Sequence, residues 1–430
     1  MPLRLYVAEP GFEDAFARFV GANREVEDDV DAVVAEILAA VRRDGDAAVA
    51  RYTEKFDRLK LAPGGFAVGG EEIETAMAAC PTETLAALET AATRIREFHE
   101  KQRPEAIQYV DDAGVRLGAR WTPLEAVGLY VPGGTASYPS SVLMNAMPAQ
   151  VAGVERIVMV VPTPDGVINP LVLAAARLGG VNEIYRIGGA QAVAALAYGT
   201  ASIRPVDKIV GPGNAYVAAA KRRVFGVVGI DLIAGPSEIL VVADAENDPD
   251  WIAIDLLSQA EHDTAAQSVL ITDSAAFADA VAAAVEARLA SLPRAEIAVE
   301  SWRDQGAIIV IEKIDDAAAI VDRIAPEHLE LAVSDPDALA GKIRHAGAIF
   351  MGRYTPEAVG DYVAGPNHVL PTSRSARFSS GLGVLDFMKR TTMVGCDADS
   401  LRRIGPAAVS LAEAEGLDAH ALSIAIRLNS

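Results

Sequence analysis

The chain has 430 residues, more than one hydrophobic core usually organises, so we expect two or more domains. Apolar residues make up 51% and charged residues 23%, an ordinary globular balance, and no apolar run is long enough to span a membrane. The formal charge of −21 comes without a basic stripe that could neutralise phosphates, which argues against a nucleic-acid partner.

The N-terminus carries neither a long apolar stretch nor a small-residue cleavage site, so no signal peptide is expected. The two cysteines, Cys80 and Cys396, do not make a disulfide framework. Together these features favour a cytoplasmic protein.

Apolar spacing predicts helix over most of residues 23–102, where Val30, Val34 and Ile37 recur on one face. Strands are then expected at 156–161, 183–187, 208–210 and 227–232, with helices at 170–178, 190–197 and 215–224. A second alternation follows, with strands at 238–243, 268–272, 307–311 and 348–351 and helices at 249–264, 274–291, 315–324 and 337–345. Two helical stretches, 399–413 and 417–428, end the chain. Near-continuous apolar strands between helices indicate two α/β lobes with parallel sheets.

A glycine-rich turn follows the strand expected at 208–210. Gly211-Pro212-Gly213-Asn214 leads into a helix, where backbone N–H groups can approach a phosphate. Asp231 lies 18 residues after Gly213, near the place of a ribose-binding acid, but the third glycine of the dinucleotide fingerprint is absent. A tight turn in any α/β protein explains the motif equally well. Similar turns at 128–134 and 187–191 fit a nucleotide-binding crevice at the strand ends.

The six histidines include a candidate metal site. Gln259 and His262 share one helix face, and Asp361 and His420 could add two more ligands. Nitrogen and oxygen donors of this kind suit zinc. The alternative is an exposed polar face, and the sequence alone does not bring the four residues together.

Glu327 and His328 are adjacent just beyond the end of a predicted helix, and such a pair can transfer protons at neutral pH. A solvated helix terminus is the competing interpretation. His99 is expected to be a solvated helix residue.

Beyond these features, the chain resembles the histidinol dehydrogenase family from about Val26 to Leu428. Eight short segments carry the resemblance in the family's order, among them Gln259-Ala260-Glu261-His262-Asp263 and Ala325-Pro326-Glu327-His328-Leu329-Glu330. The other six are residues 128–134, 188–192, 211–214, 234–238, 365–372 and 415–420.

The resemblance implies a homodimeric enzyme that oxidises L-histidinol to L-histidine through histidinaldehyde, using zinc and two NAD molecules in succession. The fold it implies is α/β, with two incomplete Rossmann-like parallel-sheet lobes whose terminal segments swap in the dimer. The expected division is an N-terminal segment at 1–25, a metal and catalytic lobe at 26–129 and 239–381, an NAD-binding lobe at 130–238, and a tail at 382–430 that contributes to the partner's active site.

The resemblance also implies roles for individual residues. Zinc would be bound by Gln259, His262, Asp361 and, from the other subunit, His420. Substrate would be held by Ser237, Gln259, His262, His328, Asp361, His368, Glu415 and His420. NAD would contact Tyr130, Gln191 and Asn214. His328 would take the substrate's hydroxyl proton, and Glu327 would activate water for the second oxidation.

Two other functions remain open on the sequence. A relative could keep the zinc and NAD machinery and oxidise a different polar alcohol, or the chain could bind a nucleotide or a metal without catalysis. The presence of Glu415 and His420 favours an imidazole-bearing amine as substrate, and the intact pair Glu327 and His328 favours catalysis.

Overall fold

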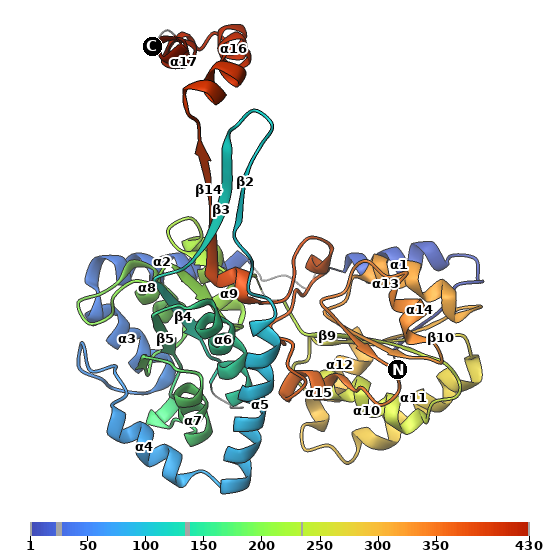
Figure 1. Cartoon of the computed structure of the whole chain (residues 1–430). Coiled ribbons are helices and arrows are strands. Elements are labelled where there is room, and N and C mark those ends of the chain that lie inside the picture. Colours follow the sequence, from blue (N-terminus) through green and yellow to red (C-terminus); the bar gives the residue numbers. More distant parts are fainter. Residues whose placement is uncertain (1, 23–27, 134–137, 234, 429–430) are drawn as a thin grey trace.

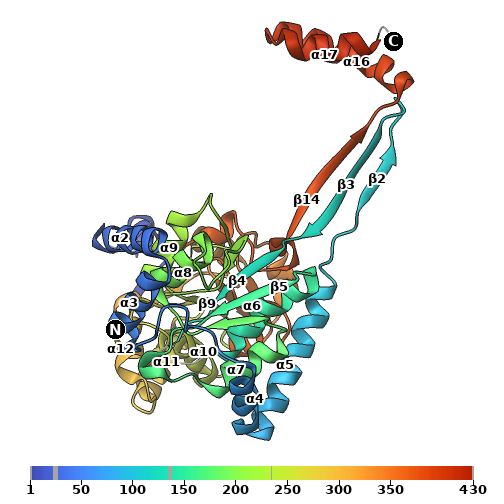
Figure 2. The same ribbon diagram turned by 90° about the vertical axis from the view of Figure 1, so that its left-hand side faces the viewer.

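The computed structural model describes residues 2–22, 28–133, 138–233 and 235–428. Two parallel sheets covered by helices form the body of the molecule, and a third, antiparallel sheet projects from it with two helices at its far end (Figure 1 and Figure 2). The predicted α/β class with two parallel-sheet lobes is thereby confirmed.

One lobe is built on a six-stranded sheet in the order β1-β11-β10-β9-β12-β13, with every neighbouring pair parallel. Its strands are β1 (Leu3–Tyr6), β9 (Glu238–Ala243), β10 (Gln267–Thr272), β11 (Ala307–Val310), β12 (His328–Ala332) and β13 (Ala348–Met351). Its helices are α1 (Phe12–Gly21), α10 (Pro249–Ala260), α11 (Ala275–Leu289), α12 (Ala295–Gln305), α13 (Ala317–Ile324), α14 (Pro336–Ala340) and α15 (Glu357–Tyr362). We call this the catalytic lobe.

The other lobe is built on a five-stranded parallel sheet in the order β6-β5-β4-β7-β8. Its strands are β4 (Ala126–Tyr130), β5 (Arg156–Val160), β6 (Glu183–Tyr185), β7 (Lys208–Val210) and β8 (Gly229–Ile230). The helices that follow its strands are α6 (Pro139–Ala152), α7 (Pro170–Leu178), α8 (Gly189–Tyr198) and α9 (Ala215–Val224). We call this the nucleotide lobe.

The N-terminal helices complete the nucleotide lobe. They are α2 (Asp28–Asp44), α3 (Asp46–Asp57), α4 (Gly70–Ala79) and α5 (Thr82–Glu100). Val34 and Val41 of α2 share a core with Leu196 of α8, and Ile95 of α5 shares one with Met147 of α6. The structure thus differs from the expected grouping of 26–129 with 239–381, because the apolar faces of these helices are buried against the 130–238 sheet.

The N-terminal segment also differs from the expected division at residue 25. Leu3 to Tyr6 pair with β11 as an edge strand, so residues 3–21 belong to the catalytic lobe. The expected boundary at 25/26 itself lies outside the described residues, as do Gly134 and Ala234 of the family segments.

The projecting sheet consists of β2 (Ile107–Val110), β3 (Arg116–Pro123) and β14 (Met388–Gly395), in the order β14-β3-β2. The tail helices α16 (Ala398–Ala414) and α17 (Asp418–Leu428) follow it. These strands were not predicted, since their side chains alternate weakly and their pairing joins residues far apart in the chain. We call this sheet with its two helices the arm. It exposes several large apolar side chains, namely Ile107, Tyr109, Val110, Met393, Val394, Leu411, Leu422 and Ile426.

The strand orders place the natural binding crevices of the two lobes. In a parallel sheet, ligands bind where consecutive strands diverge to opposite sides. In the nucleotide lobe this point lies between β4 and β7, and in the catalytic lobe between β9 and β12. Among the described residues, no helix combines the length and apolar character needed to cross a membrane.

Candidate functional site

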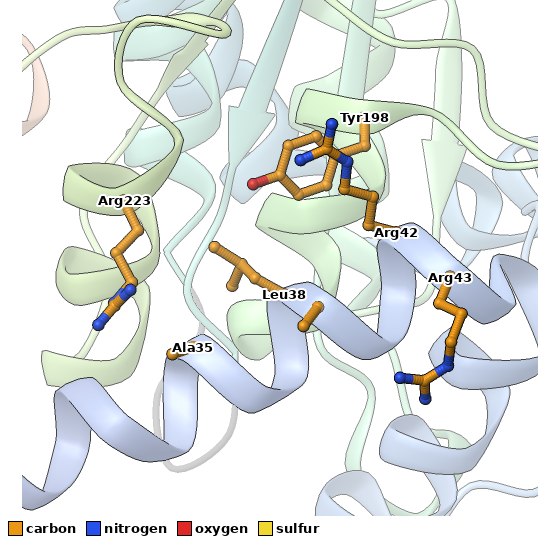
Figure 3. Close-up of a pocket in the computed structure, with 7 residues that line it drawn as sticks. Ala35, Leu38, Arg42, Arg43, Tyr198 and Arg223 are labelled. Carbon is orange, nitrogen blue, oxygen red and sulfur yellow. The ribbon is translucent and has the colours of Figure 1, made fainter.

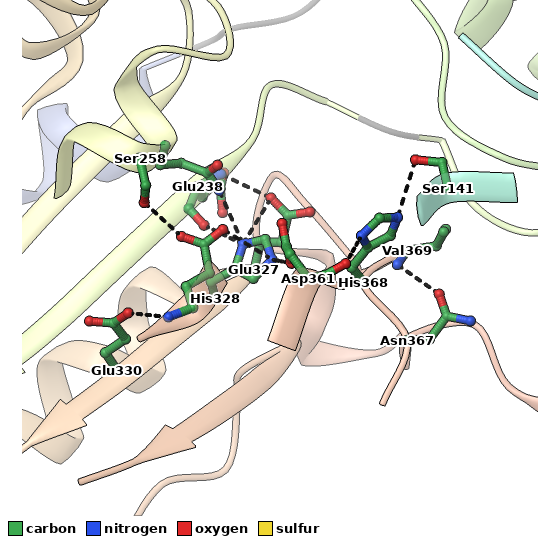
Figure 4. A network of polar contacts seen from close by, with 12 residues as sticks. Ser141, Glu238, Ser258, Glu327, His328, Glu330, Asp361, Asn367, His368 and Val369 are labelled. Atoms are coloured by element: carbon green, nitrogen blue, oxygen red, sulfur yellow. Dashed lines mark hydrogen bonds and ion pairs between the residues drawn. The ribbon is translucent and has the colours of Figure 1, made fainter. Parts of the chain in front are cut away.

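Polar side chains from four elements of the catalytic lobe converge at the amino-terminal ends of its central strands (Figure 4). His328 is the first residue of β12 and Glu238 the first of β9. Gln259 lies at the end of α10 and Asp361 in α15, and both helices run back toward this same edge of the sheet. The site therefore lies at the opposite edge from the one that parallel sheets usually use.

His328 lies at the centre of the cluster and is only 3% exposed. Its Nδ1 lies 2.9 Å from the main-chain oxygen of Glu238 and 3.1 Å from the amide of Gln259. Because a carbonyl oxygen can only accept, Nδ1 carries the proton in the bond to Glu238. Its Nε2 has no hydrogen-bond partner and lies 3.4 Å from Oδ1 of Asp361. The free nitrogen thus points at a carboxylate.

Buried carboxyl groups surround this imidazole. Oε1 of Glu357 lies 3.7 Å from its Nε2, and Oε2 of Glu327 lies 3.6 Å from its Nδ1. Burial lowers the pKa of His328, but Glu357, Glu327 and Asp361 outweigh that effect and raise it well above its ordinary value. Burial in turn raises the pKa of Glu327 to about 8 and that of Glu357 to about 7.

Glu327 is tied to the neighbouring strand. Its Oε2 accepts a hydrogen bond of 2.9 Å from the backbone N–H of Glu238, and the residue is 6% exposed. The interpretation of Glu327 and His328 as a solvated helix terminus is therefore wrong. His99, expected to be solvated, is also fully buried, with Nδ1 2.7 Å from the carbonyl oxygen of Ile95.

His262 and His368 lie close enough to Asp361 to interact with it electrostatically. Burial raises the pKa of the Asp361 carboxyl group, but His328, His368 and His262 together lower it below its ordinary value. His368 bridges the lobes, because its Nδ1 lies 3.0 Å from the Asp361 carbonyl and its Nε2 lies 3.2 Å from Oγ of Ser141 in α6. The half-buried Ser237 directly precedes β9. The structure thus gathers the six candidate residues of the catalytic lobe that were expected to contact metal or substrate, namely Ser237, Gln259, His262, His328, Asp361 and His368.

Glu415 and His420 lie elsewhere. Both are exposed, at the end of α16 and the start of α17 on the arm. The arm carries them away from the body of their own chain (Figure 1 and Figure 2). A single chain therefore does not bring these two residues to the cluster.

The residues expected to contact NAD meet at the carboxyl ends of the strands of the nucleotide lobe. Tyr130 ends β4, and its hydroxyl accepts a hydrogen bond of 3.0 Å from the N–H of Gly189, at the start of α8. Gln191 is 1% exposed, and its Oε1 has no partner. Asn214 caps α9 by accepting from the N–H groups of Tyr216 and Val217.

The loop after β7 closely approaches the end of β4. Gly211 has a φ of +107°, and a Cβ there would lie 2.1 Å from the Tyr130 carbonyl oxygen. Asp231 does not face this crevice as a ribose ligand would. Its Oδ2 accepts a hydrogen bond of 2.7 Å from the N–H of Gly211, and its Oδ1 is paired with Lys221. This geometry does not fit the ribose-binding interpretation of Asp231.

Sequence reasoning missed several polar residues of the site. They are Ser141, Glu238, Asp255, Glu330 and Glu357. Glu330 and Glu238 are charged residues in strands that are otherwise mostly apolar, and such residues are rarely buried without a partner. That signal was available from the sequence, whereas the contacts of Ser141 depend on how the lobes pack.

A cavity on the described surface lies elsewhere, lined by residues of α2, α8 and α9 (Figure 3). It has a volume of about 380 Å³ and contains none of the candidate residues. Of its arginines, Arg43 pairs with Asp44 and Arg223 pairs with Asp31, while Arg42 lies over the ring of Tyr198. Because these arginines already have partners, the candidate active site is the cluster around His328.

Comparison with known proteins agrees with this geometry. Residues 21–428 match the family model described as histidinol dehydrogenase. A histidinol dehydrogenase from Rhodospirillum rubrum is 67% identical over 430 residues, covering 100% of this chain and 99% of the relative. One from Rhizobium meliloti is 64% identical over 429 residues, with the same coverage.

A solved structure gives the same result. The crystal structure of histidinol dehydrogenase from Elizabethkingia anophelis superposes with a TM-score of 0.95 at 36% identity, covering 100% of this chain and 98% of that one. The resemblance first noted in the eight short segments is confirmed over the length of the chain. The chain belongs to the histidinol dehydrogenase family.

Proposed function

We propose that this chain catalyses the oxidation of L-histidinol to L-histidine through histidinaldehyde, with two molecules of NAD and one zinc ion per subunit. The observation that carries the proposal is the free Nε2 of His328, buried beside Asp361 and within one cluster with Gln259 and Glu327. The relatives named histidinol dehydrogenase support the choice of substrate.

The donor set fits a divalent cation. Oδ1 of Asp361 and Nε2 of His328 are buried without a hydrogen-bond partner, and ligand atoms of His328, Glu357 and Asp361 lie within 4.8 Å of one another. Buried polar atoms without partners are costly unless something else occupies the site. We assign the ligand positions to Gln259, His262, Asp361 and His420, a nitrogen and oxygen set that suits zinc. Zinc bound there would hold the imidazole and amine of the substrate and act as a Lewis acid.

His328 is the proposed general base of both oxidations. Its Nδ1–H is anchored on the Glu238 carbonyl, which directs Nε2 toward the substrate position beside Asp361. Nε2 takes the hydroxyl proton of the alcohol as hydride leaves for NAD, and it then releases that proton to solvent. It later takes a proton from the aldehyde hydrate as hydride leaves for the second NAD. The surrounding carboxyl groups raise the pKa of this ring well above its ordinary value. A cation bound at Asp361 would offset part of that negative charge and so favour the neutral base.

Glu327 is the proposed base that activates water for attack on the aldehyde. Its Oε2 is held by the backbone N–H of Glu238, which leaves Oε1 available to a water molecule. Burial raises the pKa of Glu327 to about 8, so its carboxylate is a stronger base than an exposed glutamate. Ser237 and His368 line the same site and would hold the substrate.

NAD would lie along the crevice between β4 and β7 and accept hydride at the cluster. Tyr130 and Asn214 border that crevice, and the partnerless Oε1 of Gln191 can accept a hydrogen bond from the cofactor. Ser141 follows the end of β4 and contacts His368, so the two lobes meet where hydride would pass.

We further propose that the chain acts as a homodimer, with Glu415 and His420 completing the site of the partner subunit. The exposed position of both residues on the arm and the apolar surface of that arm support a second copy as their partner. Cys80 and Cys396 are free thiols, which fits a cytoplasmic location.

The direct test measures NADH production from L-histidinol by the full-length protein, with and without added Zn²⁺ after chelation. We expect two NADH per histidinol, loss of activity on chelation and its return with Zn²⁺. Ethanol and other simple alcohols serve as controls and should not be oxidised at comparable rates. Absence of turnover with histidinol in the zinc-loaded protein would overturn the proposal.

A further inference from the structure

Behind the candidate active site lies a second pair of carboxyl groups that the proposed chemistry does not use. Glu330, the third residue of β12, is 3% exposed, and its carboxyl group interacts with that of the half-buried Asp255 in α10. A hydrogen bond between two carboxyl groups requires a proton, because two carboxylates have no donor. The pair is therefore a carboxylic acid bonded to a carboxylate.

Glu330 is the better site for that proton. Burial and the neighbouring Asp255 raise the pKa of Glu330 well above its ordinary value, and burial raises that of Asp255 to about 6. A neutral Glu330 can donate with one oxygen and accept with the other, so both ends of its carboxyl group are used.

The accepting oxygen of Glu330 holds the start of α15. Its Oε1 accepts a hydrogen bond of 2.5 Å from the backbone N–H of Glu357, the first residue of that helix. The preceding residue, Pro356, has no side chain that could cap it, so Glu330 supplies the cap from β12. Asp361 follows Glu357 by four residues and lies on the same helix face.

The other oxygen of Glu330 faces Asp255 of α10, whose spacing from Gln259 repeats the spacing of Glu357 from Asp361. Asp255 precedes Gln259 by four residues, so the two share a face of that helix. The hydrogen-bonded pair thus joins the helices that carry Gln259 and Asp361 to the strand that begins with His328. In Figure 4, Glu330 lies to the left of His328 and Asp361 to its right.

We propose that Glu330 and Asp255 are positioning residues that hold Gln259 and Asp361 in the relative orientation needed to bind the cation. The inference rests on the ligands assigned above. Residues behind a metal site commonly set the orientation of its ligands, and their loss weakens metal binding by about 10- to 100-fold.

The test compares Glu330→Ala with Glu330→Gln in the full-length protein. A glutamine amide can donate to Asp255 and accept from the N–H of Glu357, as the neutral carboxyl group does. Each metal-free protein is titrated with Zn²⁺ against a chromophoric chelator, and its unfolding by urea is measured separately. We expect Glu330→Ala to weaken zinc binding by about 10- to 100-fold and Glu330→Gln to stay within about threefold of the unaltered chain.

Glu183→Ala is the matched control, since it breaks a partly buried ion pair with Arg156 at the edge of the other sheet. It should lower the stability of the metal-free protein without changing zinc affinity. A purely structural role for Glu330 predicts the same behaviour for Glu330→Ala, and unaltered zinc affinity in that variant would overturn the inference.

A second variant covers failure of Glu330→Ala to fold. Asp255→Ala leaves the cap on α15 in place and removes only the link to α10. It should still weaken zinc binding, and unchanged affinity would again contradict the inference. If the unaltered chain binds no zinc, the proposed function itself fails. If the chain and its variants bind zinc equally well, only the positioning role of Glu330 and Asp255 fails.

Discussion

Lys221 and Asp231 form an ion pair whose side chains are each only 2% exposed. Lys221 also donates to the carbonyl oxygen of Gly211, and Asp231 accepts from the N–H of the same residue. The ion pair thus fixes both the N–H and the carbonyl group of Gly211, the first residue of the loop at 211–214. Asp231 therefore shapes this loop and does not bind ribose. The pair keeps the loop in a defined conformation although the third glycine of the dinucleotide fingerprint is absent.

Lys221→Met should destabilise the protein and weaken NAD binding. Removal of the ammonium leaves the Asp231 carboxylate buried without its partner, at a cost of about 3–5 kcal/mol. We expect the KM for NAD to rise by about tenfold while the KM for histidinol stays close to its original value. Urea unfolding and steady-state kinetics measure the two effects.

The double variant Lys221→Met with Asp231→Asn separates two effects on stability, namely the loss of the ion pair and the cost of an unpaired buried carboxylate. The asparagine keeps an acceptor for the Gly211 N–H and carries no charge, so more than half of the lost stability should return. If Lys221→Met alone is as stable as the unaltered chain, the pair contributes nothing to the loop.

Mixed dimers can test whether the arm acts on the partner subunit. His420→Asn impairs the tail, and His328→Asn impairs the catalytic lobe, so each homodimer should be nearly inactive. After subunit exchange, half of the dimers are mixed and each holds one intact site, which predicts about a quarter of the original activity.

The control for this experiment mixes His420→Asn with Glu415→Gln. Both changes lie in the tail, so every site in the mixed dimer lacks one residue and activity should stay low. Failure of the first mixture to recover activity, despite proven subunit exchange, would mean that the tail does not complete the partner's site.

Glu327→Gln should affect the two oxidations unequally. The glutamine oxygen can still accept from the N–H of Glu238, so the alcohol step should remain within about tenfold of its original rate. Loss of the base that activates water should slow aldehyde oxidation by about 100-fold or more. Stopped-flow measurement of NADH would then show one equivalent formed quickly and the second slowly. Equal slowing of both steps, or of neither, contradicts this role for Glu327.

The sequence predicts a buried strand of this fold only where the strand has a continuous apolar pattern. The apolar runs of β5 and β9 mark buried parallel strands whatever surrounds them, and both were predicted. β12 was missed, because its sequence His328-Leu329-Glu330-Leu331-Ala332 places two ionisable residues in a buried strand. Those residues break the apolar pattern because they serve the site, so the prediction fails where the function lies.

The sequence named some residues of the candidate site and missed others. Gln259 and His328 lie in family segments, and the resemblance implied a role for Asp361, but the cap that Glu330 provides for α15 depends on the register between helix and strand. The arm was harder still, because β3 pairs with residues more than 260 positions later in the chain. Local patterns carry no information about such a pairing.

Glu183 should make the stability of the nucleotide lobe depend on acid pH. Hydrogen bonding from Arg156 lowers the pKa of Glu183 to about 2, against burial, which acts in the opposite direction. Because the folded state binds this proton less readily than the unfolded state, the stabilisation is complete above about pH 4.5 and disappears as the pH falls toward 2. The carboxylate is a quarter exposed, so we expect about 1–2 kcal/mol rather than the full value implied by the shift.

The measurement compares urea unfolding of the unaltered chain and Glu183→Gln at pH 6 and near pH 3. The difference between the two proteins should be largest at pH 6 and shrink on acidification, because the glutamine does not titrate. Glu13→Gln, which breaks an exposed pair with Arg323, is the matched control and should show little dependence on pH. A difference that is constant between the two pH values would mean that Glu183 has an ordinary pKa in the folded protein.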